Sequence, residues 1–84
     1  MDSKSQIREF LAQLLAQKKD PRPFDDKASL LLTGRLDSID TVEVILFLES
    51  RFGVDFNRRG FQRSQLDSVN KIDALVTAAI ASKT

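Results

Sequence analysis

The chain has 84 residues, a formal net charge of +1, and neither cysteine nor histidine. This length allows one modest core, so we expect a single domain over residues 1–84, and the missing residue types exclude disulfides, Cys or His zinc sites, and Cys–His or Ser–His nucleophile pairs. Because the N-terminus is polar and no apolar run approaches the length of a membrane span, we expect a cytoplasmic protein without a signal peptide or transmembrane helix.

The first predicted element is an amphipathic helix. Its apolar residues recur at helical spacing on one face: Ile7, Phe10, Leu11, Leu14 and Leu15. Ser3 and Gln6 have the spacing of a capping box, which predicts a helix that begins at Ser3. The cations Lys18 and Lys19 suit the negative end of the helix dipole, and the prolines at positions 21 and 23 prevent its continuation.

Residues 20–36 show no sustained period and predict a long loop. The run Leu30-Leu31-Leu32 is its most apolar part, and we expect these leucines to anchor the loop to the core. Loops of this length are uncommon in compact domains and are usually functional. The loop is therefore the first indication of where a functional site lies.

The second predicted helix covers residues 38–52 and is apolar around much of its circumference. One stripe consists of Ile45, Leu48 and Phe52, and Gly53 follows at a C′ position. A second stripe on another face, which we call the outer stripe, consists of Ile39, Val42 and Leu46. A domain this small has little protein to cover both stripes, so we expect the outer stripe to be partly exposed as a docking patch. The alternative is that the long loop covers it.

The C-terminal part predicts one short and one long helix. Residues 54–66 are irregular, with one helical turn expected around Phe61. A final helix is expected from about Ser68 to Ala81, with an apolar stripe of Val69, Ile72, Leu75, Val76, Ala79 and Ile80. Together these elements predict an all-α protein. It would be a four-helix bundle of three main helices and a short third helix, with a long loop between helices 1 and 2.

Charge is unevenly distributed around the second helix. Between residues 36 and 50 the charged residues are all acidic: Asp37, Asp40, Glu43 and Glu49. A basic group then follows, made of Arg51, Arg58, Arg59 and Arg63. Acids near a helix start stabilise the dipole, and this role is compatible with a surface that faces a partner. No loop has calcium-ligand spacing, so we expect no metal site.

Ser38 occupies a position where a phosphate ester would be stabilised. The backbone N–H groups and the dipole at a helix N-terminus favour negative charge. The alternative is that Ser38, or Asp37 before it, is only an N-cap, and local physics alone favours this alternative because such serines are common at helix starts.

The segment GRLDSIDTVEVILFLESRFGVDF resembles the attachment region of acyl carrier proteins and related phosphopantetheine-binding carrier domains. Members of that family carry Gly-x-x-Asp-Ser-Leu/Ile at the start of the second helix and a Glu-x-x-Phe-Gly end. The matching residues here are Gly34, Asp37, Ser38 and Ile39, followed by Glu49, Phe52 and Gly53. The resemblance covers nearly the whole chain, because the predicted elements agree with the family in order and length.

The resemblance implies a carrier without catalytic residues of its own. Ser38 would be esterified with 4′-phosphopantetheine from coenzyme A by a separate phosphopantetheinyl transferase, and the arm would carry acyl or aminoacyl groups as thioesters. Asp37 would lie beside the attachment site and help the transferase. The outer stripe would be the apolar part of the docking face, and its charged rim would consist of Asp40, Glu43 and Glu49. The implied partners are this transferase, a loading ligase and downstream acyltransferases or synthases; we expect a monomer that binds no nucleic acid.

The sequence does not identify the group that the arm would carry. Many fatty-acid carriers are strongly acidic, whereas this chain is nearly neutral, which favours a specialised carrier. The run Asp67-Ser68-Val69 is similar to some stand-alone amino-acid carriers, including D-alanyl carriers. Fatty acid or lipid, polyketide, nonribosomal peptide and aminoacyl pathways all remain as alternatives. Asp67 or Ser68 is expected only to cap the last helix, because the glycine loop and the acidic helix found around Ser38 are missing there.

A second class of function is a small helical interaction module or nucleic-acid-binding module without a prosthetic group. The arginines at positions 58, 59 and 63 are suitable contacts for phosphates. However, Asp55 and Asp67 flank them, and no aromatic residues alternate with them. A protein-interaction module would explain the outer stripe but not the position of the Asp-Ser pair at the helix start.

Overall fold

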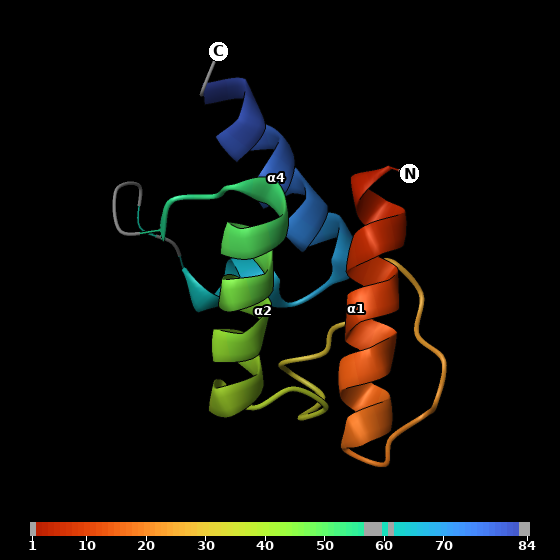
Figure 1. Ribbon diagram of the computed structural model, residues 1–84. Coiled ribbons are helices and arrows are strands. Elements are labelled where there is room, and N and C mark those ends of the chain that lie inside the picture. The colour runs from red at the N-terminus through yellow and green to blue at the C-terminus, as the bar shows by residue number, and fades with distance from the viewer. Residues whose placement is uncertain (1, 57–59, 61, 83–84) are drawn as a thin grey trace.

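The computed structural model describes residues 2–56, 60 and 62–82, and this part of the chain is helical, with no strand (Figure 1). Its α-helices are α1 (Ser3–Gln17), α2 (Ser38–Phe52) and α4 (Val69–Ser82), and a short 3-10 helix, η1 (Arg63–Leu66), precedes α4. The predicted all-α class and the predicted order of the three main helices are therefore confirmed. The short helix expected around Phe61 lies outside the described residues, so the four-helix bundle stays a prediction.

The cap of α1 differs from the prediction. Asp2 is the N-cap residue, and its carboxylate accepts a hydrogen bond from the Ser5 amide at 2.7 Å. The predicted capping box of Ser3 and Gln6 is wrong, because Ser3 is already the first helical residue. The Ser3 hydroxyl instead donates to Asp73, which joins the start of α1 to α4.

The core lies where α1, α2 and α4 meet, and it also contains residues of the loops. The buried apolar side chains of α1 are those predicted, except that Phe10 is only half-buried and stacks on Phe47 of α2 at 4.1 Å between ring centroids. In α2 the prediction is correct for Leu48 only, because Ile45 and Phe52 are half-buried and Val44 is buried instead. The fully enclosed large side chains are Ile7, Leu11, Leu15, Leu30, Leu36, Val44, Leu48, Leu66, Val69, Ile72 and Val76. Each such side chain stabilises the fold by about 2 kcal/mol through the area it removes from water.

The long loop is anchored at two leucines. Leu30 and Leu36 are buried, and the Leu36 amide donates to the Leu30 carbonyl at 2.9 Å. Only Leu30 of the predicted leucine anchor reaches the core, because Leu31 is half-buried and Leu32 is 88% exposed. Gly34 has a φ of 77°, which lets the chain turn between Leu32 and Leu36.

Asp67 holds the middle of this loop from the other end of the sequence. Its buried carboxylate accepts hydrogen bonds from the Ser29 hydroxyl and the Leu31 amide, both at 2.8 Å. Its carbonyl accepts from the Leu30 amide at 2.7 Å. Asp67, two positions before the start of α4, therefore fixes the loop that leads into α2.

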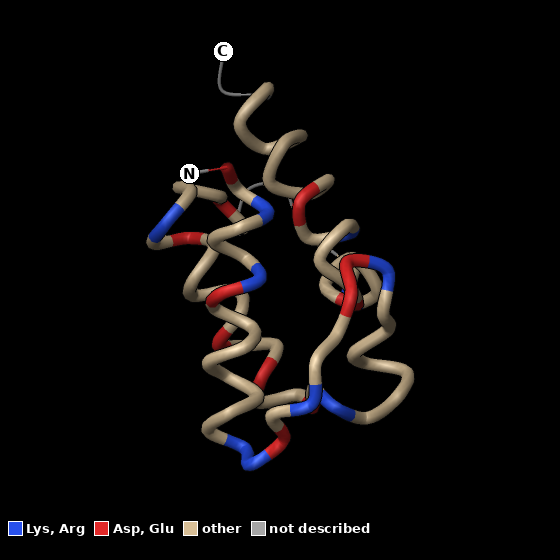
Figure 2. Tube along the Cα trace, turned by 90° about the vertical axis from the view of Figure 1, so that its right-hand side faces the viewer, with Lys and Arg blue, Asp and Glu red and all other residues tan. Residues whose placement is uncertain are grey.

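Charged residues gather at the end of the molecule where α1 runs into the long loop. Figure 2 shows acidic and basic positions alternating there along the chain. This alternation brings opposite charges within reach of one another next to the start of α2.

The leucine anchor predicts a clear difference between two neighbouring positions. Leu30→Ala is expected to lower the free energy of unfolding by about 3 kcal/mol, because it leaves a cavity in the core. Leu32→Ala, at an exposed side chain, is expected to change it by less than about 0.5 kcal/mol. Urea unfolding followed by circular dichroism measures both, and equal losses in the two variants would contradict the described loop path.

The Asp67 anchor predicts a dependence on pH. Burial raises the pKa of the Asp67 carboxyl, but the bonds from Ser29 and from the Leu31 and Leu32 amides together outweigh it and hold the pKa below its usual value. Because the folded pKa is below the unfolded value of about 3.9, the stabilisation is fully present above that value. It is lost as the pH falls through the folded pKa.

Urea unfolding of the wild type and of Asp67→Asn between about pH 6 and about pH 3 measures this effect. The wild type is expected to have the larger free energy of unfolding near the upper pH. The difference in this free energy between the wild type and Asp67→Asn is expected to become smaller as the pH falls. A difference that stays constant across the range would show that the charge of Asp67 is not what stabilises the loop.

Candidate functional site

The start of α2 is held by a reciprocal pair of hydrogen bonds. The Asp37 carboxylate accepts from the Asp40 amide, and the Asp40 carboxylate accepts from the Asp37 amide, both at 2.9 Å. Asp37 is therefore the N-cap and Asp40 completes a capping box. The hydrogen bond from the Asp40 amide also holds the pKa of the Asp37 carboxyl below its usual value, and the positive charge of Lys18 lowers it further.

Ser38 is the first residue of α2 and takes no part in the cap. Its side chain is exposed, and its hydroxyl makes no hydrogen bond within the part of the chain that the structure describes. Its carbonyl accepts from the Thr41 hydroxyl at 2.7 Å. The sequence offered Ser38 or Asp37 as the N-cap of this helix. The N-cap is Asp37, and the Ser38 hydroxyl is accessible.

Asp40 does not belong to the charged rim in which the sequence placed it. The residue is only 6% exposed, because its carboxylate faces inward to the Asp37 amide and to the Lys18 ammonium. The hydrogen bond to Asp40 is the main cause that raises the pKa of Lys18. Burying this carboxylate is tolerated because it is both paired and hydrogen-bonded.

The outer stripe is exposed, as predicted. Ile39, Val42 and Leu46 are 74%, 54% and 58% exposed, and the long loop does not cover them. Of the remaining predicted rim residues, Glu43 is exposed and Glu49 is half-buried. The side of α2 that follows Ser38 therefore presents apolar surface to solvent, which monomeric proteins usually keep for a partner.

The second Asp-Ser pair has a different environment. Ser68 is buried, and its hydroxyl oxygen accepts from the Lys71 amide at 3.2 Å in the first turn of α4. Asp67 is buried against the long loop. The predicted capping role of Ser68 is confirmed, and this hydroxyl is not accessible.

The basic group predicted after α2 is only partly visible. Arg51 donates to the Gln6 side chain at 3.1 Å and lies over the ring of Phe47, so it connects α2 to α1. Arg63 is exposed in η1. Arg58 and Arg59 lie outside the described residues.

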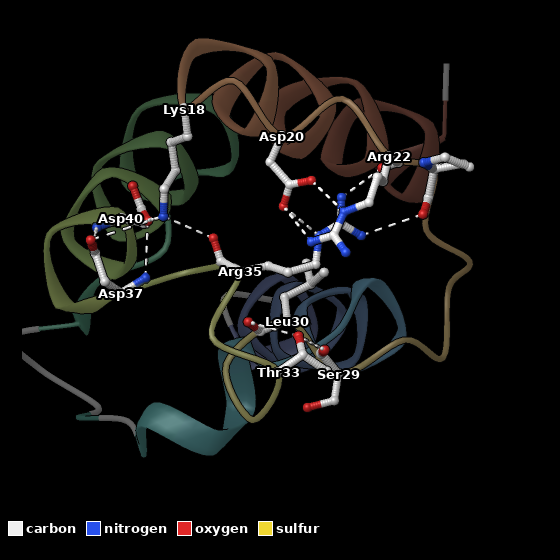
Figure 3. A network of polar contacts seen from close by, with 10 residues as sticks. Lys18, Asp20, Arg22, Ser29, Leu30, Thr33, Arg35, Asp37 and Asp40 are labelled. Carbon is white, nitrogen blue, oxygen red and sulfur yellow. Dashed lines mark hydrogen bonds and ion pairs between the residues drawn. The ribbon is translucent and has the colours of Figure 1, made fainter.

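Sequence reasoning missed two cations beside Ser38. Lys18 was interpreted only as a helix-end charge, and Arg35 was given no role. Figure 3 shows the Lys18 side chain beside Asp37 and Asp40 at the start of α2, and the Arg35 side chain extending from the end of the loop toward Asp20 and Arg22. Both flank the long loop, but a loop of this length does not by itself bring its ends together, so the sequence carried no usable signal for these contacts.

Two classes of site find no support in the described residues. In that part of the chain, no group of three or more carboxylates is arranged to hold a metal ion. Across the same residues, none of the helices combines the length and apolar character needed to cross a membrane.

Comparison with known proteins gives a consistent set of relatives. The chain is 38% identical over 76 residues to the D-alanyl carrier protein of Lacticaseibacillus rhamnosus, covering 90% of this chain and 91% of the relative. It is 35% identical over 80 residues to that of Leuconostoc mesenteroides subsp. mesenteroides, covering 95% and 99%. A match to that of Lacticaseibacillus casei reaches 49% identity over 51 residues, and it spans 61% of this chain and 63% of the relative.

No protein-family model matches the chain, and no solved structure matches it significantly. The matches to the first two relatives extend over nearly the full length of both chains, so the matched region includes the long loop and the start of α2. This agrees with the resemblance to carrier proteins seen around Ser38. The chain belongs to the family of D-alanyl carrier proteins, which are stand-alone carriers with a phosphopantetheine-binding domain.

Proposed function

We propose that this protein carries D-alanyl groups as thioesters on a 4′-phosphopantetheine arm attached to Ser38, and presents them to partner enzymes without catalysing a reaction itself. It acts as a monomeric single domain in the cytoplasm, with a short third helix completing a four-helix bundle. The observation that carries the proposal is the exposed, unbonded Ser38 hydroxyl directly after the Asp37 cap, in a chain of this family.

The site suits attachment of the arm. In the transfer, the Ser38 oxygen attacks the phosphorus that bears pantetheine in coenzyme A, and the bond between that phosphorus and the bridging oxygen of the diphosphate breaks. Adenosine 3′,5′-bisphosphate leaves, and the hydroxyl proton passes to a base of the transferase. The positive end of the α2 dipole favours the phosphodiester that results.

The composition supports the same proposal. The chain has no cysteine, so the thiol that forms the thioester has to come from the arm. The D-alanyl group is small and needs no internal acyl cavity, which fits a core filled by apolar side chains. The names of the relatives give no support to fatty acid, polyketide or nonribosomal peptide cargo.

The outer stripe is the proposed docking face for the transferase, the loading ligase and the enzyme that accepts the D-alanyl group. It follows Ser38 on the same helix, so a partner seated on Ile39, Val42 and Leu46 has the arm at the edge of its contact. Glu43 adds a charge at this face, and charge complementarity mainly tunes the encounter rate and the choice of partner. Nucleic acid is not a proposed partner.

Attachment is tested by incubation with coenzyme A and a phosphopantetheinyl transferase of broad specificity, followed by intact mass measurement. The wild type and Ser68→Ala are expected to gain the mass of one phosphopantetheine, and Ser38→Ala to gain none. The cargo is then tested by giving the labelled protein the D-alanine-activating ligase, ATP and either D- or L-alanine. No labelling of the wild type by a transferase active on other carriers would refute the proposal.

Docking is tested with two exposed leucines of the same size. Leu46→Arg on the outer stripe is expected to lower kcat/KM for D-alanine loading by roughly thirtyfold, the effect of losing a contact worth about 2 kcal/mol. Leu32→Arg, outside the stripe, is the matched control and is expected to load normally. Circular dichroism should show both variants folded; an unfolded Leu46→Arg, or equal loading of both variants, would contradict a docking role.

A further inference from the structure

Two cations join the start of the long loop to its end, immediately before Ser38. Lys18 caps the C-terminus of α1, and Arg35 lies three positions before Ser38. Figure 3 shows their side chains entering one polar network from opposite ends of the loop. We call this pair and its contacts the loop clamp.

Lys18 connects three consecutive parts of the chain. Its ammonium donates to the Arg35 carbonyl at 2.8 Å and to the Asp40 carboxylate, and it lies 3.9 Å from the Asp37 carboxylate. One charge on α1 therefore contacts the end of the loop, the N-cap of α2 and the partner of that N-cap. These are the groups that determine where the backbone of Ser38 lies.

Arg35 contacts the other side of the loop. Its guanidinium donates to the Asp20 carboxylate at 2.9 Å, to the Arg22 carbonyl at 2.6 Å and to the Pro23 carbonyl at 3.3 Å. The Arg35 side chain is only 11% exposed and lies over the ring of Phe24. A planar group that satisfies three acceptors in different directions leaves the residue little freedom to move.

The hydroxyl of Ser38 has no hydrogen bond of its own among the described residues, so its position depends on the backbone alone. On the upstream side, Gly34 stands at a positive φ, and a Cβ at this position would meet no neighbour within 4 Å, so its restraint is the hydrogen bond from its amide to the Leu31 carbonyl at 3.1 Å. The restraints that remain between Gly34 and Ser38 are the buried Leu36, the capping box and the loop clamp. A nucleophile that reacts in a partner's active site benefits from such restraint, because a displacement of about 1 Å can cost roughly a hundredfold in rate.

We propose that Lys18 and Arg35 are positioning residues for phosphopantetheine transfer, which hold the Ser38 backbone in the orientation that the transferase requires. This inference rests on the proposed function of Ser38. The acids of the clamp are largely shielded from solvent, so removing either cation is expected to cost some global stability as well. The consequence specific to the clamp is a misplaced nucleophile, which is seen under conditions where the variant is still folded.

The chain contains a matched control. Arg8 also extends from α1 to the long loop, where it makes two hydrogen bonds of 2.7 Å to Asp26. Its hydrogen bonds go to Asp26 and not to Asp37 or Asp40, so Arg8 is separate from the loop clamp. Arg8→Met therefore removes a comparable link between helix and loop without touching the start of α2.

The test compares the wild type with Lys18→Met, Arg35→Met, Lys18→Arg, Arg35→Lys and Arg8→Met. The kcat of phosphopantetheine transfer and the KM for the carrier chain are measured with saturating coenzyme A, at a temperature where circular dichroism shows every variant folded. Hydrogen exchange of the Asp40 and Thr41 amides is measured on the unmodified chain, so that the state of the cap is known whether or not Ser38 is labelled.

Both methionine variants at the clamp are expected to lose roughly tenfold to a hundredfold in kcat with little change in KM. Lys18→Arg keeps a cation that donates to the same two acceptors and is expected to restore kcat. Arg35→Lys is expected to remain slow, because one ammonium does not reach three divergent acceptors. Arg8→Met is expected to match the wild type, and Lys18→Met to exchange its Asp40 and Thr41 amides faster.

Unchanged kcat in both Lys18→Met and Arg35→Met would overturn the positioning role while leaving the proposed attachment to Ser38 intact. An equal loss of kcat in Arg8→Met would also overturn it, since general loosening of the loop would then explain all variants. A wild type that takes no label would refute the proposed function itself, so the two failures are distinguishable.

Discussion

The reciprocal hydrogen bonds between Asp37 and Asp40 are the constraint on which the presentation of α2 depends. With Asp37 as the cap, the next side chain in the sequence is released from the helix end and points its hydroxyl to solvent. Asp40 is turned inward by the same pair of bonds, and the residues that follow it on the outer side of α2 remain apolar and exposed. One local motif thus separates the proposed attachment residue from the buried acid and from the proposed docking surface.

Lys18 stabilises the buried Asp40 carboxylate by pairing with its charge. A charged carboxylate that is buried without a partner is strongly destabilising. The ammonium of Lys18 compensates that charge and also fixes the end of the loop through the Arg35 carbonyl. The C-terminal end of α1 and the N-terminal end of α2 are therefore parts of one electrostatic unit.

The two Asp-Ser pairs show how the same dipeptide serves opposite purposes. At positions 37 and 38 the aspartate caps and the serine is exposed, whereas at 67 and 68 the serine caps and the aspartate is buried. The reversal arises because Asp67 has donors from the long loop to bind, which draws its carboxylate away from the helix end. The buried pair holds the loop, and the loop leads to the exposed pair.

The sequence by itself determined the three main helices and the exposure of Ile39, Val42 and Leu46, because these follow from periodicity, from glycine and proline positions and from the small size of the domain. The choice of Ser38 over Ser68 came from the resemblance to carrier proteins and stays a proposal. Only the tertiary structure decided that Asp2 caps α1, that Leu32 faces solvent while Leu30 is buried, that Asp40 turns inward to Lys18, and that Arg35 joins the end of the long loop to its start. The cap of α1 is local, but Asp2 and Ser3 are both suitable cap residues and spacing does not choose between them. The other three depend on which residue from a distant segment stands opposite, and spacing along a chain carries no information about that.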